Sequence, residues 1–156
     1  FDAFYAQGRR FEAPEVLELT QKTRALLPNT TLCVTVPHIL PLDEQVALAE
    51  KLVEVGANLI QTEGGTSSDP THSGTLGLIE KAAPTLAAAH SISRAVSVPV
   101  ICASGLSTVT APMAITAGAS GVGVGSAINK LNDEVAMVAA VRSLVESLQS
   151  SIKVNL

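Results

Sequence analysis

The chain has 156 residues, of which 47% are apolar and 15% are charged, and its formal net charge at pH 7 is −4. This composition is typical of one globular domain with a sizeable core, and no apolar run approaches the length of a membrane span. Because the basic residues are scattered singly apart from Arg9 and Arg10, we expect neither nucleic acid nor a membrane as partner, and we expect a small ligand.

The first half of the chain predicts helices that alternate with short strands. Pro14, at a first helical position, opens a helix that ends before Pro28. A β-branched run at 31–36 predicts the first strand, and Asp43 is the expected N-cap of the helix that follows it. A glycine ends that helix, and residues 59–62 predict the second strand.

The second half continues the same alternation. An alanine-rich helix that runs to about Val96 is expected to be interrupted at Pro84, and residues 98–103 predict the third strand. A short helix and a fourth strand at 121–124 follow. The last helix is expected to bury one apolar stripe, formed by Val138, Val141, Val145 and Leu148.

Short apolar strands separated by helices indicate an α/β fold with a parallel sheet covered on its outer face. An open sheet places its glycine-rich phosphate turn after the first strand, but here such turns follow the last two strands, which is typical of strands seven and eight of a barrel. Residues 1–156 are therefore predicted to form one partial domain, the C-terminal half of a (β/α)₈ TIM barrel. Half a barrel exposes two sheet edges, so we expect completion by the missing half-barrel or homo-oligomerisation.

The two cysteines, Cys33 and Cys102, both lie in apolar, strand-like runs. A free cysteine in such a run behaves as a small hydrophobic residue, so both are expected to be reduced core residues. Their spacing supports neither a disulfide nor a metal site, and no metal is expected.

Several separate runs of the sequence are similar to one family. These runs are Phe1–Arg9, Val34–His38, Ile60–Ser67, Ile101–Ser107 and Gly121–Lys130. They resemble the hypothetical chloroplast open reading frame 23 family of algal plastids, cyanobacteria and plants, and the resemblance covers nearly the whole chain. It implies a TIM-barrel protein of the phosphate-binding superfamily, located in the plastid stroma or the cyanobacterial cytoplasm, with no established activity.

The ends of the predicted strands supply the acid–base candidates, because the reactive groups of a barrel hang from those ends. Glu63 follows the second strand, and burial is expected to raise its pKa toward that of a general base. His38 follows the first strand and is the second catalytic candidate. Gln61, Gly64 and Gly65 are expected to contact the substrate, with the two glycines leaving room for it.

The glycine-containing turns after the last two strands are expected to bind a phosphate. Where a Cβ atom is absent, an anion can approach backbone N–H groups closely, and the start of a helix adds positive potential. The expected phosphate-binding residues are Ser104, Gly105, Gly125 and Ser126.

Three functions remain open from the sequence. The first is an isomerase or lyase acting on a phosphorylated small molecule, with Glu63 and His38 transferring protons. The second is an oxidoreductase that holds the phosphate of FMN in the same turns, which makes FMN the one cofactor candidate. The third is a non-catalytic barrel that binds a phosphorylated metabolite in a regulatory role.

Overall fold

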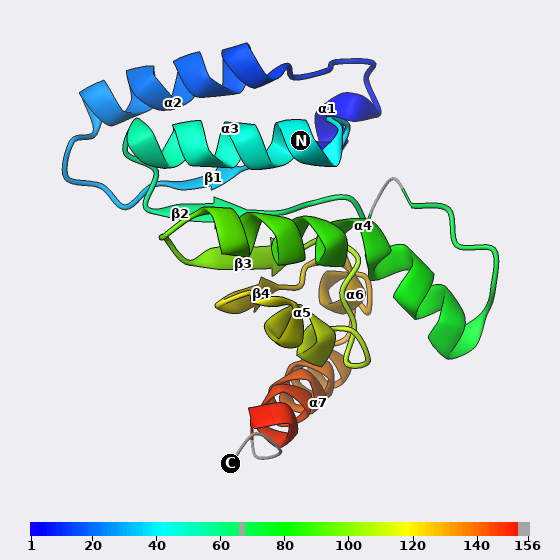
Figure 1. The fold of residues 1–156 in the computed structure, drawn as a ribbon. Helices are drawn as coiled ribbons and strands as arrows, with labels where there is room; N and C mark the ends of the chain where they lie inside the picture. Colours follow the sequence, from blue (N-terminus) through cyan, green and yellow to red (C-terminus); the bar gives the residue numbers. More distant parts are fainter. Residues whose placement is uncertain (66–67, 153–156) are drawn as a thin grey trace.

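The computed structural model describes residues 1–65 and 68–152, and helices alternate with strands along most of this length (Figure 1). The elements are α1 (Asp2–Tyr5), α2 (Ala13–Leu26), β1 (Cys33–Thr35), α3 (Leu42–Glu54), β2 (Leu59–Gln61), α4 (Gly74–Ala95), β3 (Val100–Ala103), α5 (Ala111–Ala117), β4 (Gly121–Gly123), α6 (Ser126–Asn129) and α7 (Glu134–Ile152). All four predicted strands are present, each slightly shorter than the run that predicted it. Two residues of the predicted loop after β2, Thr66 and Ser67, lie outside the described residues.

The four strands form one parallel sheet in the order β1-β2-β3-β4. Cys33 pairs with Leu59, Ile60 with Val100, and Ile101 with Gly121. Neighbours in the chain are therefore neighbours in the sheet, with no reversal of strand order of the kind that defines a doubly wound fold. This order is consistent with half a barrel.

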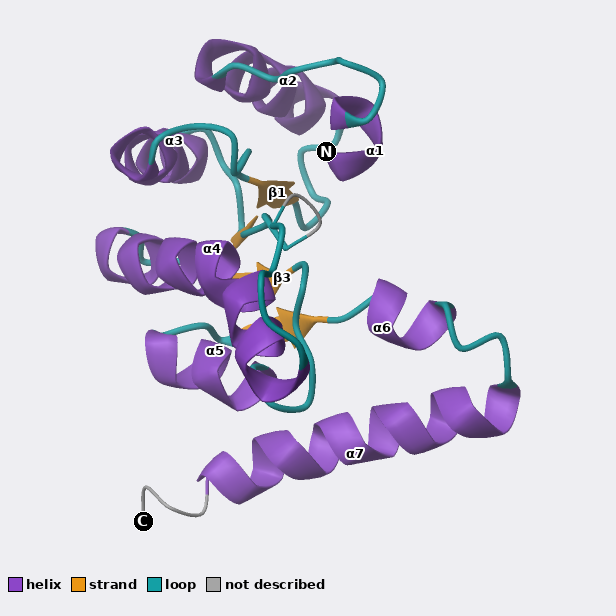
Figure 2. Ribbon diagram, turned by 90° about the vertical axis from the view of Figure 1, so that its right-hand side faces the viewer, coloured by secondary structure: helices purple, strands orange, loops and turns teal. Residues whose placement is uncertain are grey.

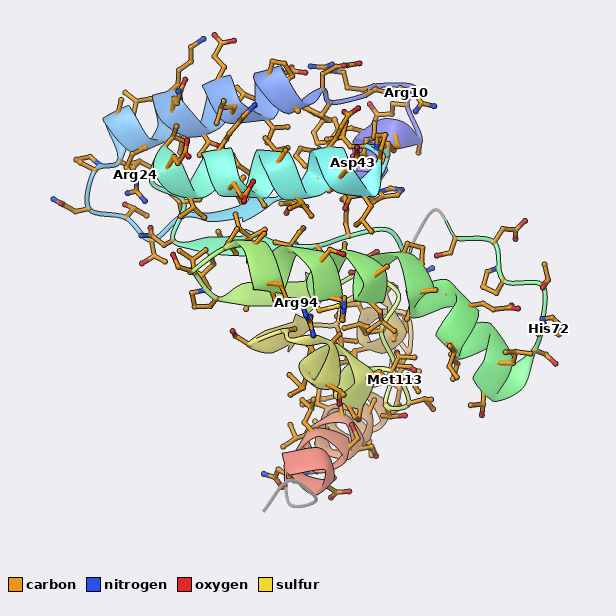
Figure 3. The ribbon with its side chains drawn as sticks, in the orientation of Figure 1. Arg10, Arg24, Asp43, His72, Arg94 and Met113 are labelled. Atoms are coloured by element: carbon orange, nitrogen blue, oxygen red, sulfur yellow. The ribbon has the colours of Figure 1, made fainter. Side chains whose placement is uncertain are left out.

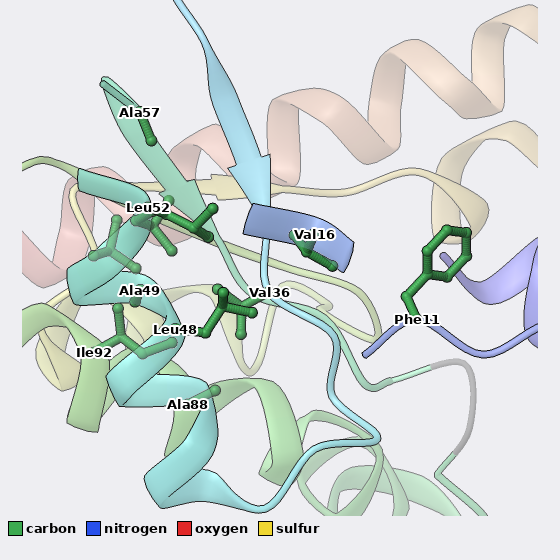
Figure 4. Close-up of a cluster of buried hydrophobic side chains, with 11 residues drawn as sticks. Phe11, Val16, Val36, Leu48, Ala49, Leu52, Ala57, Ala88 and Ile92 are labelled. Carbon is green, nitrogen blue, oxygen red and sulfur yellow. The ribbon is translucent and has the colours of Figure 1, made fainter. Parts of the chain in front are cut away.

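Helices α3, α4 and α5 cover one face of the sheet, as Figure 2 shows with the strands viewed from the side on which they end. The core lies between these helices and the strands and contains Leu52, Ile60, Ile92 and Val100, each at most 1% exposed (Figure 4). Because successive strand residues point to opposite faces, Leu59 and Gln61 point away from the helix layer that buries Ile60. The second face of the sheet is thus the one that a complete barrel would enclose.

Two helix-to-strand joints with matching sequence also have matching geometry. Gly56 and Gly118 adopt left-handed backbone conformations, with φ of 99° and 113°. In each joint the N–H of the next residue, Ala57 or Ala119, donates to the carbonyl oxygen five residues earlier, at 2.9 Å and 3.0 Å respectively. This is the helix-ending geometry that glycine permits without strain.

Each joint is held by an arginine from the last turn of an earlier helix, Arg24 of α2 for the first joint and Arg94 of α4 for the second (Figure 3). The Arg24 guanidinium donates from Nε to the carbonyl oxygen of Gly56 at 3.1 Å and from Nη2 to Oδ1 of Asn58 at 2.6 Å. Arg94 Nη1 donates to the carbonyl oxygen of Ala117 at 3.1 Å. The segments α2-β1-α3-β2 and α4-β3-α5-β4 therefore have the same order of elements and corresponding arginine contacts.

The expected N-cap role of Asp43 is wrong. Helix α3 begins at Leu42 with Pro41 in the cap position, and no side chain caps it. The carbonyl oxygen of Pro41 accepts the first helical hydrogen bond, from Gln45 at 2.9 Å, so Asp43 lies inside the first turn. There its negative charge still favours the positive end of the helix dipole.

The expected interruption at Pro84 is a bend rather than a break. Helix α4 continues through Pro84 to Ala95, and Figure 1 shows it changing direction between its two halves. A proline inside a helix removes one N–H donor and displaces the preceding turn, which bends the axis. A neighbouring carbonyl oxygen, that of Lys81, accepts a hydrogen bond from Ser68 Oγ at 2.7 Å, so the bend ties the helix to the loop after β2.

Two burial predictions are also wrong. Val138, Val141 and Val145 of α7 are each 44–45% exposed, because this helix packs mainly on α5 and α6 and leaves one side uncovered in the described chain. Cys33 is exposed, since it lies on an edge strand and points away from the core that Val34 contacts, whereas Cys102 is buried as expected. Within the described residues, no helix is both long enough and apolar enough to cross a membrane.

Candidate functional site

The residues singled out from the sequence lie at one rim of the sheet, where the parallel strands end (Figure 2). His38 follows β1, Glu63 follows β2, Ser104 follows β3, and Gly125 follows β4. The rim carries two features. A cluster of ionisable side chains lies beyond β1 and β2, and a glycine-lined pocket lies beyond β3 and β4.

The carboxylate of Glu63 is 5% exposed and is surrounded by hydrogen-bond donors. Its Oε1 atom accepts from the hydroxyl of Tyr5 at 2.8 Å and from the backbone N–H of His38 at 3.2 Å. The same oxygen lies 3.0 Å from Nδ1 of His38. Its Oε2 atom accepts from the backbone nitrogen of Phe1 at 3.1 Å. We refer to Tyr5, His38 and Glu63 as the Glu63 cluster.

These contacts reverse the expected pKa of Glu63. Burial is the largest single influence and raises the pKa, but hydrogen bonds from the His38 ring, the Tyr5 hydroxyl, the His38 backbone and the Phe1 nitrogen together lower it further. The net pKa of Glu63 is therefore below its ordinary value. Burial acts in the predicted direction, but the predicted net rise toward the pKa of a general base is wrong, because the hydrogen bonds together outweigh burial. A carboxylate with so many donors is stabilised as the anion and is a poor proton acceptor.

His38 is held on two sides. Its Nδ1 atom faces the Glu63 carboxylate, and the Tyr5 ring meets the imidazole edge-on, with ring centroids 5.3 Å apart and an interplanar angle of 72°. An ionised carboxylate only accepts hydrogen bonds, so we assign the ring proton to Nδ1 from the hydrogen-bond network. In the neutral ring, Nε2 then carries the lone pair.

Tyr5 was not identified from the sequence as a site residue. Its contact with Glu63 spans 58 positions of the chain. The available signal was the unusual concentration of aromatic residues at Phe1, Phe4 and Tyr5. Such a cluster indicates that the segment packs against something, but not what it packs against.

Gln61 and the two glycines after Glu63 have structural partners. The side-chain amide of Gln61 donates to Thr35 Oγ1 across the β1–β2 pair at 3.3 Å. A Cβ atom on Gly64 would lie 3.0 Å from Cβ of Pro84, and one on Gly65 would overlap the backbone of Gly105. The space next to the Cα atom of each glycine is thus filled by the protein itself, which explains the absence of a side chain by close packing of loops. The expected contact of Gln61, Gly64 and Gly65 with a substrate stays a prediction.

The four predicted phosphate-binding residues lie together. One pocket of about 230 Å³ is lined by residues of both turns, namely Ser104, Gly105, Leu106, Gly123, Val124, Gly125, Ser126 and Ala127. We call it the corner pocket. Larger hollows of about 300–500 Å³ lie next to helices α2 and α3, but none of the predicted site residues lines them. Volume alone therefore does not identify the site.

The backbone of the corner pocket presents hydrogen-bond donors. Among residues 1–65 and 68–152, no acceptor pairs with the N–H groups of Gly105, Gly125, Ser126 or Ala127. Ser104 and Gly105 have φ of 74° and 76°, so both residues of the first turn adopt left-handed backbone conformations. Among the residues that the structure describes, no charged side chain lines the pocket, so none of them places a carboxylate next to an anion there.

A buried polar group supports the strand ends beneath the rim. The hydroxyl groups of Thr62 and Thr85 lie 2.6 Å apart, and Thr85 Oγ1 also donates to the carbonyl oxygen of Ala103 at 2.5 Å. Both threonines are at most 1% exposed. Because buried hydroxyls must find partners, this network fixes α4 relative to β2 and β3. In the described part of the chain, no group of three His, Cys, Asp or Glu residues is arranged to hold a metal ion.

A model of the family described as "Protein of unknown function (DUF561)" matches residues 1–154. The chain belongs to this family. It is 42% identical over 151 residues to the uncharacterized protein ycf23 of Porphyra purpurea, covering 97% of this chain and 57% of that protein. It is also 44% identical to ycf23 of Pyropia yezoensis and 42% identical to ycf23 of Cyanophora paradoxa, each over 88% of this chain. These matches confirm the resemblance read from the sequence and make the chain a protein of plastid type.

The chain spans about half the length of the curated relatives it matches, between 50% and 57% for these three. The fold also occurs in a chain of the crystal structure of the Amycolatopsis orientalis BexX/CysO complex, with a TM-score of 0.57 and 16% sequence identity. That match covers 91% of this chain and 52% of the other. At this identity the likeness concerns the fold alone.

Proposed function

We propose that the full-length natural protein is a TIM-barrel protein that binds a phosphorylated small molecule in the corner pocket and acts on it as an isomerase or lyase. The observation that carries the proposal is that two turns distant in sequence line one pocket with N–H groups that have no partner among the described residues. Such N–H groups satisfy a phosphate without a lysine.

The number of donors is adequate for specific binding. A hydrogen bond to a charged group contributes about 1.5–3 kcal/mol net, so three of them supply roughly 5–9 kcal/mol before the cost of association is subtracted. A phosphate alone is therefore expected to bind weakly, and a phosphoester that also contacts the rest of the rim more tightly.

The Glu63 cluster supports a chemical role beyond binding. A histidine whose ring is oriented by a carboxylate lies on the same rim as the pocket. A binding protein has no need of an oriented imidazole, whereas proton transfer does. The proposed location is the plastid stroma or the cyanobacterial cytoplasm, where phosphorylated small molecules are accessible.

The face of the sheet that α3, α4 and α5 leave uncovered supports completion of the barrel (Figure 2). We expect further residues of the full-length protein, or a second copy, to cover this face and the exposed side of α7, because an open sheet edge and an uncovered apolar helix favour association. The greater length of the relatives is in keeping with this expectation.

Isothermal titration of the full-length protein with inorganic phosphate and with a panel of phosphoesters tests the proposal. We expect saturable binding of phosphate, tighter binding of at least one phosphoester, and no binding of the dephosphorylated counterparts. Equal binding of esters and their dephosphorylated forms would refute it. A yellow chromophore that co-purifies and shows a flavin spectrum would favour the oxidoreductase alternative.

A further inference from the structure

We propose that His38 is the proton-transfer residue of this site, acting through Nε2, and that Glu63 and Tyr5 are positioning residues. The proposal rests on the proposed function for its substrate, a phosphoester held in the corner pocket. It reverses the interpretation that makes Glu63 the general base.

The Glu63 carboxylate is fully engaged by hydrogen-bond donors and is poorly placed to accept a proton. Oε2 accepts a hydrogen bond from the Phe1 nitrogen, and Oε1 has three donors within 3.2 Å, from Tyr5 and from the backbone and ring of His38. With 5% of its surface exposed, the group also has little access to a ligand. A base in this position would have to break several charge-assisted hydrogen bonds to accept a proton.

In the His38 ring, Nδ1 is engaged by Glu63 and Nε2 is available. The carboxylate holds Nδ1, and within the described residues no hydrogen-bond partner faces Nε2. The His38 side chain is 11% exposed, so the ring is mostly enclosed but not sealed from the rim. This is the division of roles found wherever a carboxylate orients a histidine that exchanges protons through its other nitrogen.

Tyr5 contacts both Glu63 and His38 and holds them in place. Its hydroxyl donates to Glu63 Oε1, and its ring meets His38 edge-on. The tyrosine therefore prevents rotation of the imidazole about its Cβ–Cγ bond while it helps to keep Glu63 ionised. A positioned ring loses less entropy on reaching the transition state than a mobile one.

The distance between His38 and the corner pocket sets a minimum length for the substrate. His38 follows β1 and the corner pocket follows β3 and β4, so at least two strand spacings of ~4.8 Å separate them, a minimum of roughly 10 Å. Proton transfer needs the reacting atom about 3 Å from Nε2. The remaining span of roughly 7 Å requires about six covalent bonds at the rise of an extended chain. The structure therefore assigns to this site a phosphoester with a chain of five or more atoms between its phosphorus and the reacting centre.

The chain contains a matched control for the Glu63–His38 pair. Glu80 accepts from the backbone N–H of His72 at 3.1 Å and lies 2.6 Å from its Nδ1 atom, which is the same pattern of contacts on the N-terminal part of α4 (Figure 3). The His72 side chain is 58% exposed, and neither residue lines the corner pocket. Glu80→Gln therefore removes an equivalent carboxylate from an equivalent histidine outside the proposed site.

The first measurement is ¹⁵N NMR of the histidine rings in the full-length protein. We expect the neutral His38 ring to carry its proton on Nδ1, and Glu63→Gln to change that tautomer population, whereas Glu80→Gln leaves the His38 signals unchanged. A proton on Nε2 of His38 in the wild-type protein would overturn the assignment.

The second measurement is exchange of solvent deuterium into phosphoesters of increasing chain length at saturating concentration. We expect exchange only for the longer esters, a 10²- to 10⁴-fold loss in His38→Gln with unchanged phosphate affinity, and a smaller loss in Tyr5→Phe. Phosphate binding with no exchange of any ester, or exchange that survives His38→Gln, would overturn the role of His38 while the proposed binding function stands. If the wild-type protein does not bind phosphate at all, the proposed function itself is refuted.

Discussion

Substitution of Gly125 by aspartate places a negative charge in the corner pocket. Gly125 has φ of −113°, and a Cβ atom built on it meets no other atom within 4 Å, so the fold accommodates a side chain there. Two like charges about 5 Å apart repel by ~3 kcal/mol at an effective dielectric constant near 20, and the second phosphate charge adds to this. Because Gly125 is exposed, solvent screens part of the repulsion, and we expect a loss of about 2–3 kcal/mol, or ~30- to 150-fold in affinity.

The assay is titration of inorganic phosphate into the full-length protein, with Gly125→Ala as the matched control. Alanine adds the same Cβ atom without the charge, so it is expected to retain affinity within a few fold. Raising the salt concentration should narrow the difference between the two variants, because screening weakens repulsion at an exposed position. Wild-type affinity in Gly125→Asp would show that the phosphate does not lie in this pocket.

Two further predictions concern stability. Gly105→Ala should lower the melting temperature more than Gly74→Ala, since both positions have left-handed φ but only a Cβ on Gly105 would meet Cα of Gly65 at 2.7 Å and the carbonyl oxygen of Lys81 at 2.9 Å. Strain alone is worth about 1 kcal/mol, and the overlap adds to it, so equal melting temperatures would contradict the packing of the two loops. Because the folded-state pKa of Glu63 is lowered, its stabilisation is present above the unfolded value of about 4.3 and is lost as pH falls through the folded pKa. The urea concentration at the unfolding midpoint of the wild-type protein should therefore decrease as the pH is lowered below about 5. Glu63→Gln should show a smaller decrease. Equal decreases in the two proteins would contradict the lowered pKa of Glu63.

The local signals in the sequence were sufficient for the order of the elements. Gly56 and Gly118 end their helices as predicted, because a left-handed residue after a helix is a local requirement that glycine meets best. The turn residues of the corner pocket were identified for a similar reason. A glycine-rich turn after a buried parallel strand has few structural explanations, and parallel topology brings successive turns to one rim.

Long-range pairing decided the points that the sequence did not reveal. The pKa of Glu63 is lowered because hydrogen bonds from His38, Tyr5 and the Phe1 nitrogen together outweigh burial. Tyr5 is remote in sequence and carries no motif that predicts its partner. The exposure of Val141 in α7 depends on what covers the helix, not on the apolar period that identifies it. Asp43 was assigned as the N-cap from residue preference, whereas Pro41, with its fixed φ, occupies the cap position two residues earlier.

The Gly64–Gly65 segment links the two halves of the proposed site. Glu63 holds His38 with its carboxylate, and two residues later Gly65 packs against the backbone of Gly105 at the corner pocket. Since consecutive Cα atoms are 3.8 Å apart, the Cα atoms of Glu63 and Gly65 are at most about 7 Å apart. Gly64 and Gly65 have no side-chain rotamers that could change this distance. Pro84 contacts Gly64 from the bend of α4, so the helix fixes the segment from outside. If His38 transfers protons and the corner pocket binds phosphate as we propose, the distance between them is set by packed backbone rather than by side-chain rotamers. A site must meet this condition to select a substrate by its length.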